Sequence, residues 1–272
     1  MRLKSTHSHA RRAKKMNSGN AIYQVGGLVR NCAFDNCFWT NHEHFNGVAM
    51  LMSGSNARAE NCFFTNNVVP WAYANWDSWP GGIVAVLDGA QLVNSLIADN
   101  EMTVVSHESQ STLHALAVYA AGGAMVQNCA IVSNRVGKAM TQESGTQSSC
   151  YTCALVCNNA TVVNTLVADN ICTEEDGKVI NHRNATAAMS YCATLPVDTL
   201  TGEGNIAADA SQYFYNGRKF KLPAQSSLVN RGTTLEWHQT AVDLYGGKRL
   251  IGRSVDIGPV ESRCSGLRIV VR

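Results

Sequence analysis

The sequence predicts an all-β fold, a right-handed parallel β-helix in which short strands coil around one elongated core. The first observation is a repeat: the phrase VNSLIADN at 93–100 returns as VNTLVADN at 163–170. Related phrases give five copies that start at 31, 61, 94, 128 and 164, with steps of 30, 33, 34 and 36 residues. Such a period is typical of solenoids and propellers. The second observation is that the segments between copies lack the 3.6-residue periodicity of helices.

Each repeat is expected to contain three short strands and one long loop. An apolar run comes first, as in VAMLM from Val48 or IVAVL from Ile83, and a small-residue turn such as SGSN or DGA follows. A second short strand leads to the repeated Asn, a third strand follows it, and a polar loop closes the repeat. A WD-repeat propeller would need four strands per blade and Trp-Asp endings, which the sequence lacks.

The aligned copies predict three core columns, because three positions take only small or apolar residues. These columns are Val29, Ala59, Leu92, Val126 and Val162; Cys32, Cys62, Ser95, Cys129 and Thr165; and Phe34, Phe64, Ile97, Ile131 and Val167. The chain has ten cysteines. Buried thiols behave as small hydrophobes, and a disulfide between Cys32 and Cys62 on adjacent turns is the alternative.

Asparagines predict a structural ladder at one corner of the solenoid. Its members are Asn31, Asn61, Asn94, Asn128 and Asn164. Asn tolerates the left-handed backbone of a sharp turn, and its amide can bond to the same amide one layer away, at about 4.8 Å. A second column, Asn67, Asn100, Asn134 and Asn170, is expected to end the third strand in the same way.

Four regions follow from these patterns: a basic disordered head at 1–19, β-helix turns at 20–200, a C-terminal end or cap at 201–262 and a tail at 263–272. The first 18 residues hold six of the 22 basic and none of the 20 acidic residues, so the remainder carries a net charge of −4. We therefore expect no nucleic-acid surface on the body. The head is interpreted as a solvated tail, with contact to nucleic acid or anionic lipid as the alternative. No 18-residue apolar stretch predicts a membrane span.

The C-terminal third carries a different pattern. It comprises Tyr191-Cys192, Gly204-Asn205-Ile206, Phe220, Leu222, Ser227, Gly232, Asp243, Gly246, Arg249, Gly252 and VDIGPVE at 255–261. On these residues, about 20–262 resembles bacterial right-handed β-helix surface proteins of the choice-of-anchor Q or pectate-lyase-like kind. The sequence departs from that pattern at Pro259-Val260, where Ala-Tyr is usual, and at Asp209-Ala210, where Asp-Pro is common.

The resemblance implies a secreted or cell-surface bacterial protein but no single activity, since function lies in sites and not in folds. Arg249 and Asp256 are expected to pair or cap within this segment. Proteins of this kind normally carry an export signal and more turns. Here a basic stretch without an apolar region precedes the first turn, which is not a signal peptide. We therefore expect a fragment of a longer chain.

Few residues of the sequence are candidates for a metal or catalytic site. Asp99 and Asp169 are the weak candidates for Ca²⁺, but they stand two turns apart, about 9–10 Å by strand spacing, and Ca²⁺ takes six to eight oxygens. Cys150, Cys153 and Cys157 form a C-x2-C-x3-C pattern with no evident fourth zinc ligand. No cofactor and no catalytic residue are therefore assigned. The enzyme alternative is a polysaccharide lyase or glycoside hydrolase acting on an acidic polysaccharide.

Aromatic residues give the most suggestive functional signal. The segment PWAYANWDSWPGG at 70–82 holds Trp71, Tyr73, Trp76 and Trp79, and CFWTNHEHF at 37–45, one turn earlier, adds Trp39. Aromatic faces on an exposed loop suit sugar stacking and interfaces, although such rings also pack loops onto a core. The expected function is an extracellular structural or adhesive β-helix module that binds a polysaccharide or cell-surface glycan, an adhesin rather than an enzyme.

Overall fold

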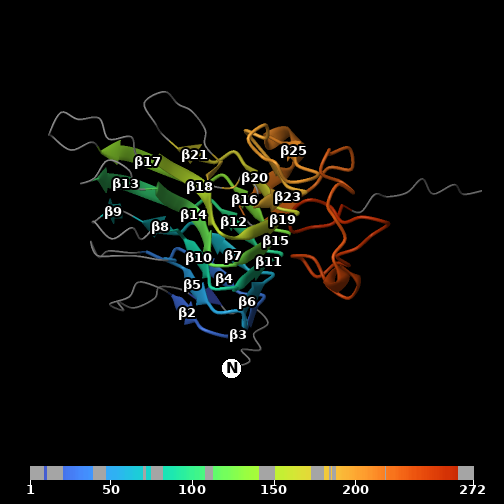
Figure 1. Ribbon diagram of the computed structural model, residues 1–272, viewed down its shortest axis with the longest axis horizontal. Coiled ribbons are helices and arrows are strands. Elements are labelled where there is room, and N and C mark those ends of the chain that lie inside the picture. The colour runs from blue at the N-terminus through green and yellow to red at the C-terminus, as the bar shows by residue number, and fades with distance from the viewer. Residues whose placement is uncertain are drawn as a thin grey trace, which may run out of the picture.

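The computed structural model describes residues 9–10, 21–38, 47–69, 72–74, 82–107, 113–140, 151–172, 181–183, 185, 188–217 and 219–262. These residues form the parallel β-helix that the repeat predicts, and no α-helix occurs among them (Figure 1). In the same part of the chain, no helix has the length and apolar character that crossing a membrane requires.

Four parallel sheets run the length of the solenoid, and we name them A to D. Sheet A consists of β1 (His9–Ala10), β4 (Ala33–Asp35), β7 (Phe63–Thr65), β12 (Leu96–Ala98), β16 (Ala130–Val132), β20 (Leu166–Ala168), β24 (Ala193–Thr194) and β25 (Ile206–Ala207). Sheet B consists of β2 (Ile22–Gln24), β5 (Met50–Ser53), β10 (Val84–Leu87), β14 (Leu113–Ala121), β18 (Tyr151–Asn158) and β22 (His182–Arg183).

Sheet C consists of β3 (Gly27–Arg30), β6 (Ala57–Glu60), β11 (Gln91–Val93), β15 (Met125–Gln127), β19 (Thr161–Val163) and β23 (Met189–Ser190). Sheet D consists of β8 (Val68–Val69), β9 (Ala72–Ala74), β13 (Glu101–His107), β17 (Arg135–Met140) and β21 (Ile171–Cys172). One turn of the solenoid passes through sheets B, C, A and D in that order. The C-terminal part adds two 3-10 helices, η1 (Ala210–Gln212) and η2 (Glu236–Gln239), and the antiparallel hairpin of β26 (Phe214–Asn216) and β27 (Lys219–Lys221).

Sheet D is a departure from the three-strand repeat that the sequence predicts. The polar segments taken for loops begin as strands, and β13 extends over seven residues. The segment EMTVVSH has the β-branched residues that favour a strand, but its polar ends hide this in the alignment. The turns that begin at β5, β10, β14 and β18 therefore also have a strand in sheet D, and the longer connections run from sheet D to sheet B.

The predicted core columns are confirmed by the strand register. Leu92 pairs with Ala59 on one side and with Val126 on the other. Phe64 and Ile97 pair in the same manner within sheet A, and the rings of Phe34 and Phe64 stack with centroids 4.8 Å apart. These side chains are buried in one continuous core. The solenoid is therefore held together by columns of like residues at the strand spacing.

The described cysteines are buried thiols: Cys32, Cys37, Cys62, Cys129, Cys153, Cys157 and Cys192. Burial raises the pKa of Cys129 to about 12, so this thiol stays protonated and packs as a small apolar group. Cys153 and Cys157 pack in different clusters, and Cys150 lies outside the described residues. The two described members of the C-x2-C-x3-C pattern therefore do not converge.

The asparagine ladder forms in the column that ends the third strand. The Oδ1 atom of Asn134 accepts from the backbone N of Asn100 at 3.1 Å and from its Nδ2 at 2.7 Å. The Nδ2 of Asn134 donates to Ile97 O and to the Oδ1 of Asn170. The same pattern repeats along Asn67, Asn100, Asn134 and Asn170, and it continues to Asn181, which the sequence comparison missed.

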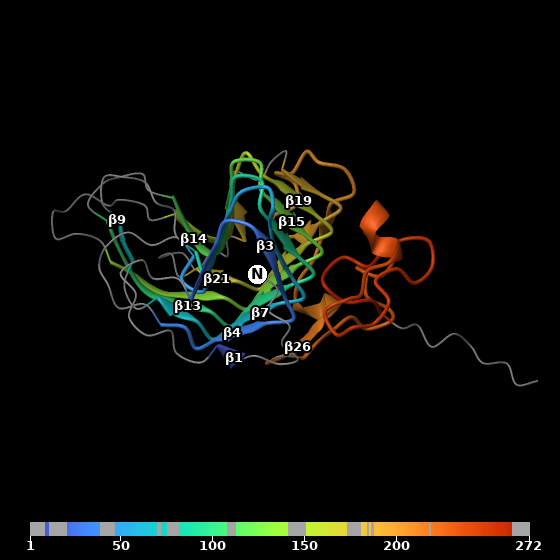
Figure 2. The ribbon, with the colours of Figure 1, turned by 90° about the horizontal axis from the view of Figure 1, so that it is seen from below.

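The region 201–262, of which we call residues 209–262 the C-terminal segment, was expected to form the end or cap of the solenoid. Only β25 does so, as the last strand of sheet A. The chain then runs back along the outside, beside sheet A (Figures 1 and 2). The outward residues Leu96, Ala130 and Leu166 pack with a second buried cluster that the segment supplies. The strands LIA, AIV and LVA are apolar on both faces, which is typical of strands covered on both sides.

The predicted regions at the chain ends are described only in part. His9–Ala10, inside the head expected to be disordered, forms β1 and pairs with β4. The rest of the head and the tail at 263–272 lie outside the described residues.

Candidate functional site

The aromatic residues of the predicted ridge lie mostly outside the described residues. Trp39, Trp71, Trp76 and Trp79 are not among them, and Tyr73 is placed only by the backbone of β9, where it pairs with Ser106. The strands beside them are described. Phe38 pairs with Val68 across adjacent turns, so the segments 37–45 and 70–82 start from neighbouring positions on one side of the solenoid.

The two calcium candidates are engaged by tyrosines of the C-terminal segment. The Oδ2 of Asp99 accepts from the hydroxyl of Tyr215 at 2.6 Å, and the Oδ2 of Asp169 accepts from Tyr213 at 2.5 Å. Burial, followed by the neighbouring carboxylate, raises the pKa of both phenols. These hydroxyls stay protonated and donate. In the described ranges, no three His, Cys, Asp or Glu side chains are grouped so as to hold a metal ion.

The first asparagine column has the predicted backbone but not the predicted side-chain ladder. Asn31, Asn61, Asn94, Asn128 and Asn164 all have positive φ, between 46° and 56°. The side chains of Asn61, Asn94, Asn128 and Asn164 bind the C-terminal segment. Asn61 Nδ2 donates to Asp243 O at 3.1 Å, and Asn94 Nδ2 donates to Val242 O at 2.9 Å.

The next two members of this column bind the same segment. Asn164 Nδ2 donates to Thr233 O at 2.8 Å, and its Oδ1 accepts from Thr233 N at 2.7 Å. Asn128 Oδ1 contacts His238 Nε2 at 3.0 Å. From Thr233 to Asp243 the segment therefore passes successive turns of the solenoid, from the later turns back to the earlier ones. This asparagine column therefore binds the chain's own C-terminal segment along several turns of the solenoid.

Among the described contacts of this asparagine column, the one made by a titratable side chain is that of His238. Its Nδ1 accepts from Leu235 N at 2.9 Å, so the proton lies on Nε2, which donates to Asn128 Oδ1. Burial lowers the pKa of His238 to about 3, and the Arg249 charge acts in the same direction. No sequence pattern points to this role, since His238 is one of several scattered histidines.

The protonation of His238 predicts a loss of stability in acid. The unfolded chain takes up this proton near pH 6.5, whereas the folded chain resists it until about pH 3, so the unfolded state binds more protons in this window. Wild type is expected to lose roughly 3 kcal/mol more between pH 7 and pH 4 than His238→Gln, whose amide also donates to Asn128 but does not titrate. Urea unfolding at both pH values measures the difference. Equal losses in the two proteins would contradict the assigned role.

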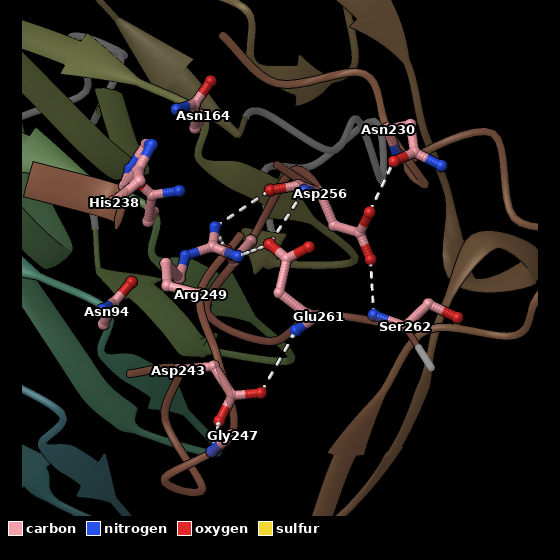
Figure 3. A network of polar contacts seen from close by, with 12 residues as sticks. Asn94, Asn164, Asn230, His238, Asp243, Gly247, Arg249, Asp256, Glu261 and Ser262 are labelled. Atoms are coloured by element: carbon pink, nitrogen blue, oxygen red, sulfur yellow. Dashed lines mark hydrogen bonds and ion pairs between the residues drawn. The ribbon is translucent and has the colours of Figure 1, made fainter. Parts of the chain in front are cut away.

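A buried ionic cluster closes the C-terminal segment on itself (Figure 3). Arg249, which has no exposed surface, donates from Nη1 to Glu261 and from Nη2 to the backbone oxygens of Asp256 and Gly258. The expected side-chain pairing of Arg249 with Asp256 is therefore replaced by pairing with Glu261. The carboxylate of Asp256 instead accepts from Asn230 N and Ser262 N.

The electrostatics of this cluster fit a structural role. Burial raises the pKa of Glu261, while the Arg249 guanidinium acts against that rise. The Asp243 carboxylate accepts hydrogen bonds from three backbone N–H groups, those of Tyr245, Gly247 and Glu261. Shifted pKa values mark functional sites and structural ion networks alike. Here the acids are less than 10% exposed and their oxygens are bonded to backbone donors, so the cluster fixes the segment.

Comparison with known proteins found no match: no family model, no curated protein and no solved structure is similar to the chain. The class that the structure defines is the parallel β-helix with an asparagine ladder.

Proposed function

We propose that the chain is a structural or adhesive module of an extracellular or cell-surface protein, and that it binds a polysaccharide through the connections from sheet D to sheet B. The observation that carries this proposal is the placement of those connections. They leave neighbouring strands of sheet D and return to neighbouring strands of sheet B. On the other side of the solenoid lies the C-terminal segment (Figure 2).

Two of these connections contain Trp39, Trp76 and Trp79, and Trp71 lies just before the second of them, between β8 and β9. Large aromatic rings at low entropy cost suit recognition surfaces, and a stacked solenoid offers them a rigid support. The C-terminal motif resembles that of bacterial choice-of-anchor Q or pectate-lyase-like surface proteins. This resemblance supports the proposed location and a proposed relationship of the chain to those proteins. The alternative, a lyase or glycosidase, would use carboxylates, and Asp99 and Asp169 are both bonded to tyrosines.

The proposal predicts retention by a polysaccharide without product release. Full-length protein is run against a panel of neutral and acidic polysaccharides, with and without Ca²⁺, and both retention and released sugar are scored. Trp76→Ala is expected to weaken retention at least tenfold, because a stacked ring contributes a large share of the contact.

The matched control is Tyr23→Ala, which removes a ring that is 61% exposed on β2. This variant is expected to bind as wild type does. Release of unsaturated or reducing-end sugars would overturn the non-enzymatic proposal, and equal loss in both variants would overturn the assignment to the loops.

A further inference from the structure

The β26–β27 hairpin is fixed to the solenoid by its inward-facing residues. Tyr215 and Phe220 are cross-strand partners. Tyr215 donates to Asp99, and Phe220 is fully buried, with its ring centroid 5.4 Å from that of Tyr213. The backbone N of Phe220 donates to the Tyr245 hydroxyl at 2.7 Å. The hairpin is therefore held by side chains from one face only.

The other face of the hairpin projects into solvent. Alternate residues of a strand point to opposite faces, and the exposed set here is Phe214, Asn216, Lys219 and Lys221. Phe214 lies directly opposite Lys221, and Asn216 lies directly opposite Lys219. Directly opposed residues have Cβ atoms about 5 Å apart, so an aromatic ring and two ammonium groups share one small surface.

Exposed aromatic area is the unusual part of this surface. Phe214 is 49% exposed at a position where a solvent-facing strand residue is normally polar, and Tyr245, beside the hairpin, is 50% exposed. The Tyr245 hydroxyl accepts from the hairpin backbone, which orients the ring. The Tyr245 ring also contacts the ring of Phe63, with centroids 6.1 Å apart, and its remaining surface faces solvent.

We infer that this face of the hairpin, formed by Phe214, Lys219, Lys221 and Tyr245, is a binding surface for an acidic polysaccharide. Aromatic faces stack on the apolar faces of sugar rings, and the two lysines pair with the carboxylates of uronate residues as mobile point charges. A positive patch on a body with a net charge of −4 favours an anionic ligand that approaches this face. The surface lies on the C-terminal segment and not on the sheet D connections, so the inference stands apart from the proposed function.

The test measures binding of full-length protein to polygalacturonate by calorimetry. Phe214→Ser and the double variant Lys219→Gln/Lys221→Gln are each expected to weaken binding at least tenfold. The matched control for charge is Arg231→Gln/Arg253→Gln, which removes two positive charges from exposed positions of the same segment. Tyr23→Ser is the control for the ring. Both controls are expected to stay within twofold of wild type.

Each other outcome overturns the inference. Equal loss in the two double variants would mean a response to net charge alone, and equal binding of polyacrylate or single-stranded DNA would mean that any polyanion suffices. Binding that survives the hairpin variants but is lost in Trp76→Ala would place the ligand on the loops. No binding of polygalacturonate by wild type would exclude the surface as a uronate site. Thermal unfolding of each variant confirms that the hairpin variants remain folded.

Discussion

Replacing Arg249 by methionine is expected to lower the free energy of unfolding by roughly 3–5 kcal/mol, because breaking a buried ion pair leaves its partner uncompensated. Arg249 is fully buried and holds Glu261 together with two backbone oxygens, those of Asp256 and Gly258. Methionine fills a similar volume but leaves the two backbone oxygens without this donor and Glu261 without its counter-charge. The Glu261 carboxyl then has to be protonated to stay inside.

Urea unfolding at pH 7 measures this loss. The control is Arg231→Met, which makes the same exchange at an exposed arginine of the same segment and is expected to change the free energy of unfolding by less than about 0.5 kcal/mol. A loss below about 1 kcal/mol in Arg249→Met would mean that water or another donor satisfies the cluster, and the closed segment of Figure 3 would be wrong.

Substitution of Asn134 by alanine is expected to cost roughly 3 kcal/mol of stability. The Asn134 amide lies in the middle of the ladder and has no exposed surface. Its loss leaves Asn100 N and Ile97 O without these partners in the core, and the Asn100 amide keeps only its bond to Phe64 O. Each buried polar group left unpaired costs about 1–3 kcal/mol, and bonds within such a network strengthen one another.

The control variant for the ladder is Asn56→Ala, at an exposed turn residue directly before β6 of sheet C. Its free energy of unfolding is expected to stay within about 0.5 kcal/mol of wild type. If Asn134→Ala were as mild as Asn56→Ala, the ladder would be a consequence of the fold and not a source of its stability.

The repeat made the solenoid predictable, because each turn places like residues at the same position. The match of Leu92 to Ala59 and Val126, and the left-handed backbone at the repeated Asn, follow from alignment of the copies alone. The fourth strand was hidden, since β13 and β17 begin in segments that vary from turn to turn.

The path of the C-terminal segment was not predictable from its motif. A motif names residues such as Arg249 and Asp256 but does not say which surface they meet. The usable signal lay elsewhere, in β12, β16 and β20, whose outward positions are as apolar as the inward ones and so require a cover. This also explains the misplaced ladder: the amides of Asn61 and Asn94 are occupied by that cover, not by one another.

The candidate sites also differ in whether the sequence alone could predict them. Sequence patterns found the aromatic clusters around Trp71 and Trp76, which composition reveals directly. They did not find the face of the hairpin, because Phe214 and Lys221 become neighbours only through antiparallel pairing. Asp99 and Asp169 were sensible metal candidates by type, and their tyrosine partners come from residues 44 or more positions away.

The central claim is that the C-terminal segment folds together with the solenoid as one cooperative unit and is not an appended cap. Hydrogen exchange of backbone amides tests this most directly. The amides of Gly232 and Thr233, bonded to Val255 O and to Asn164 Oδ1, are expected to exchange with the same free energy as those of Asn100 and Asn134 in the ladder. Exchange of the segment about 1,000-fold faster than the ladder would contradict the claim, since the segment would then open while the solenoid stays folded.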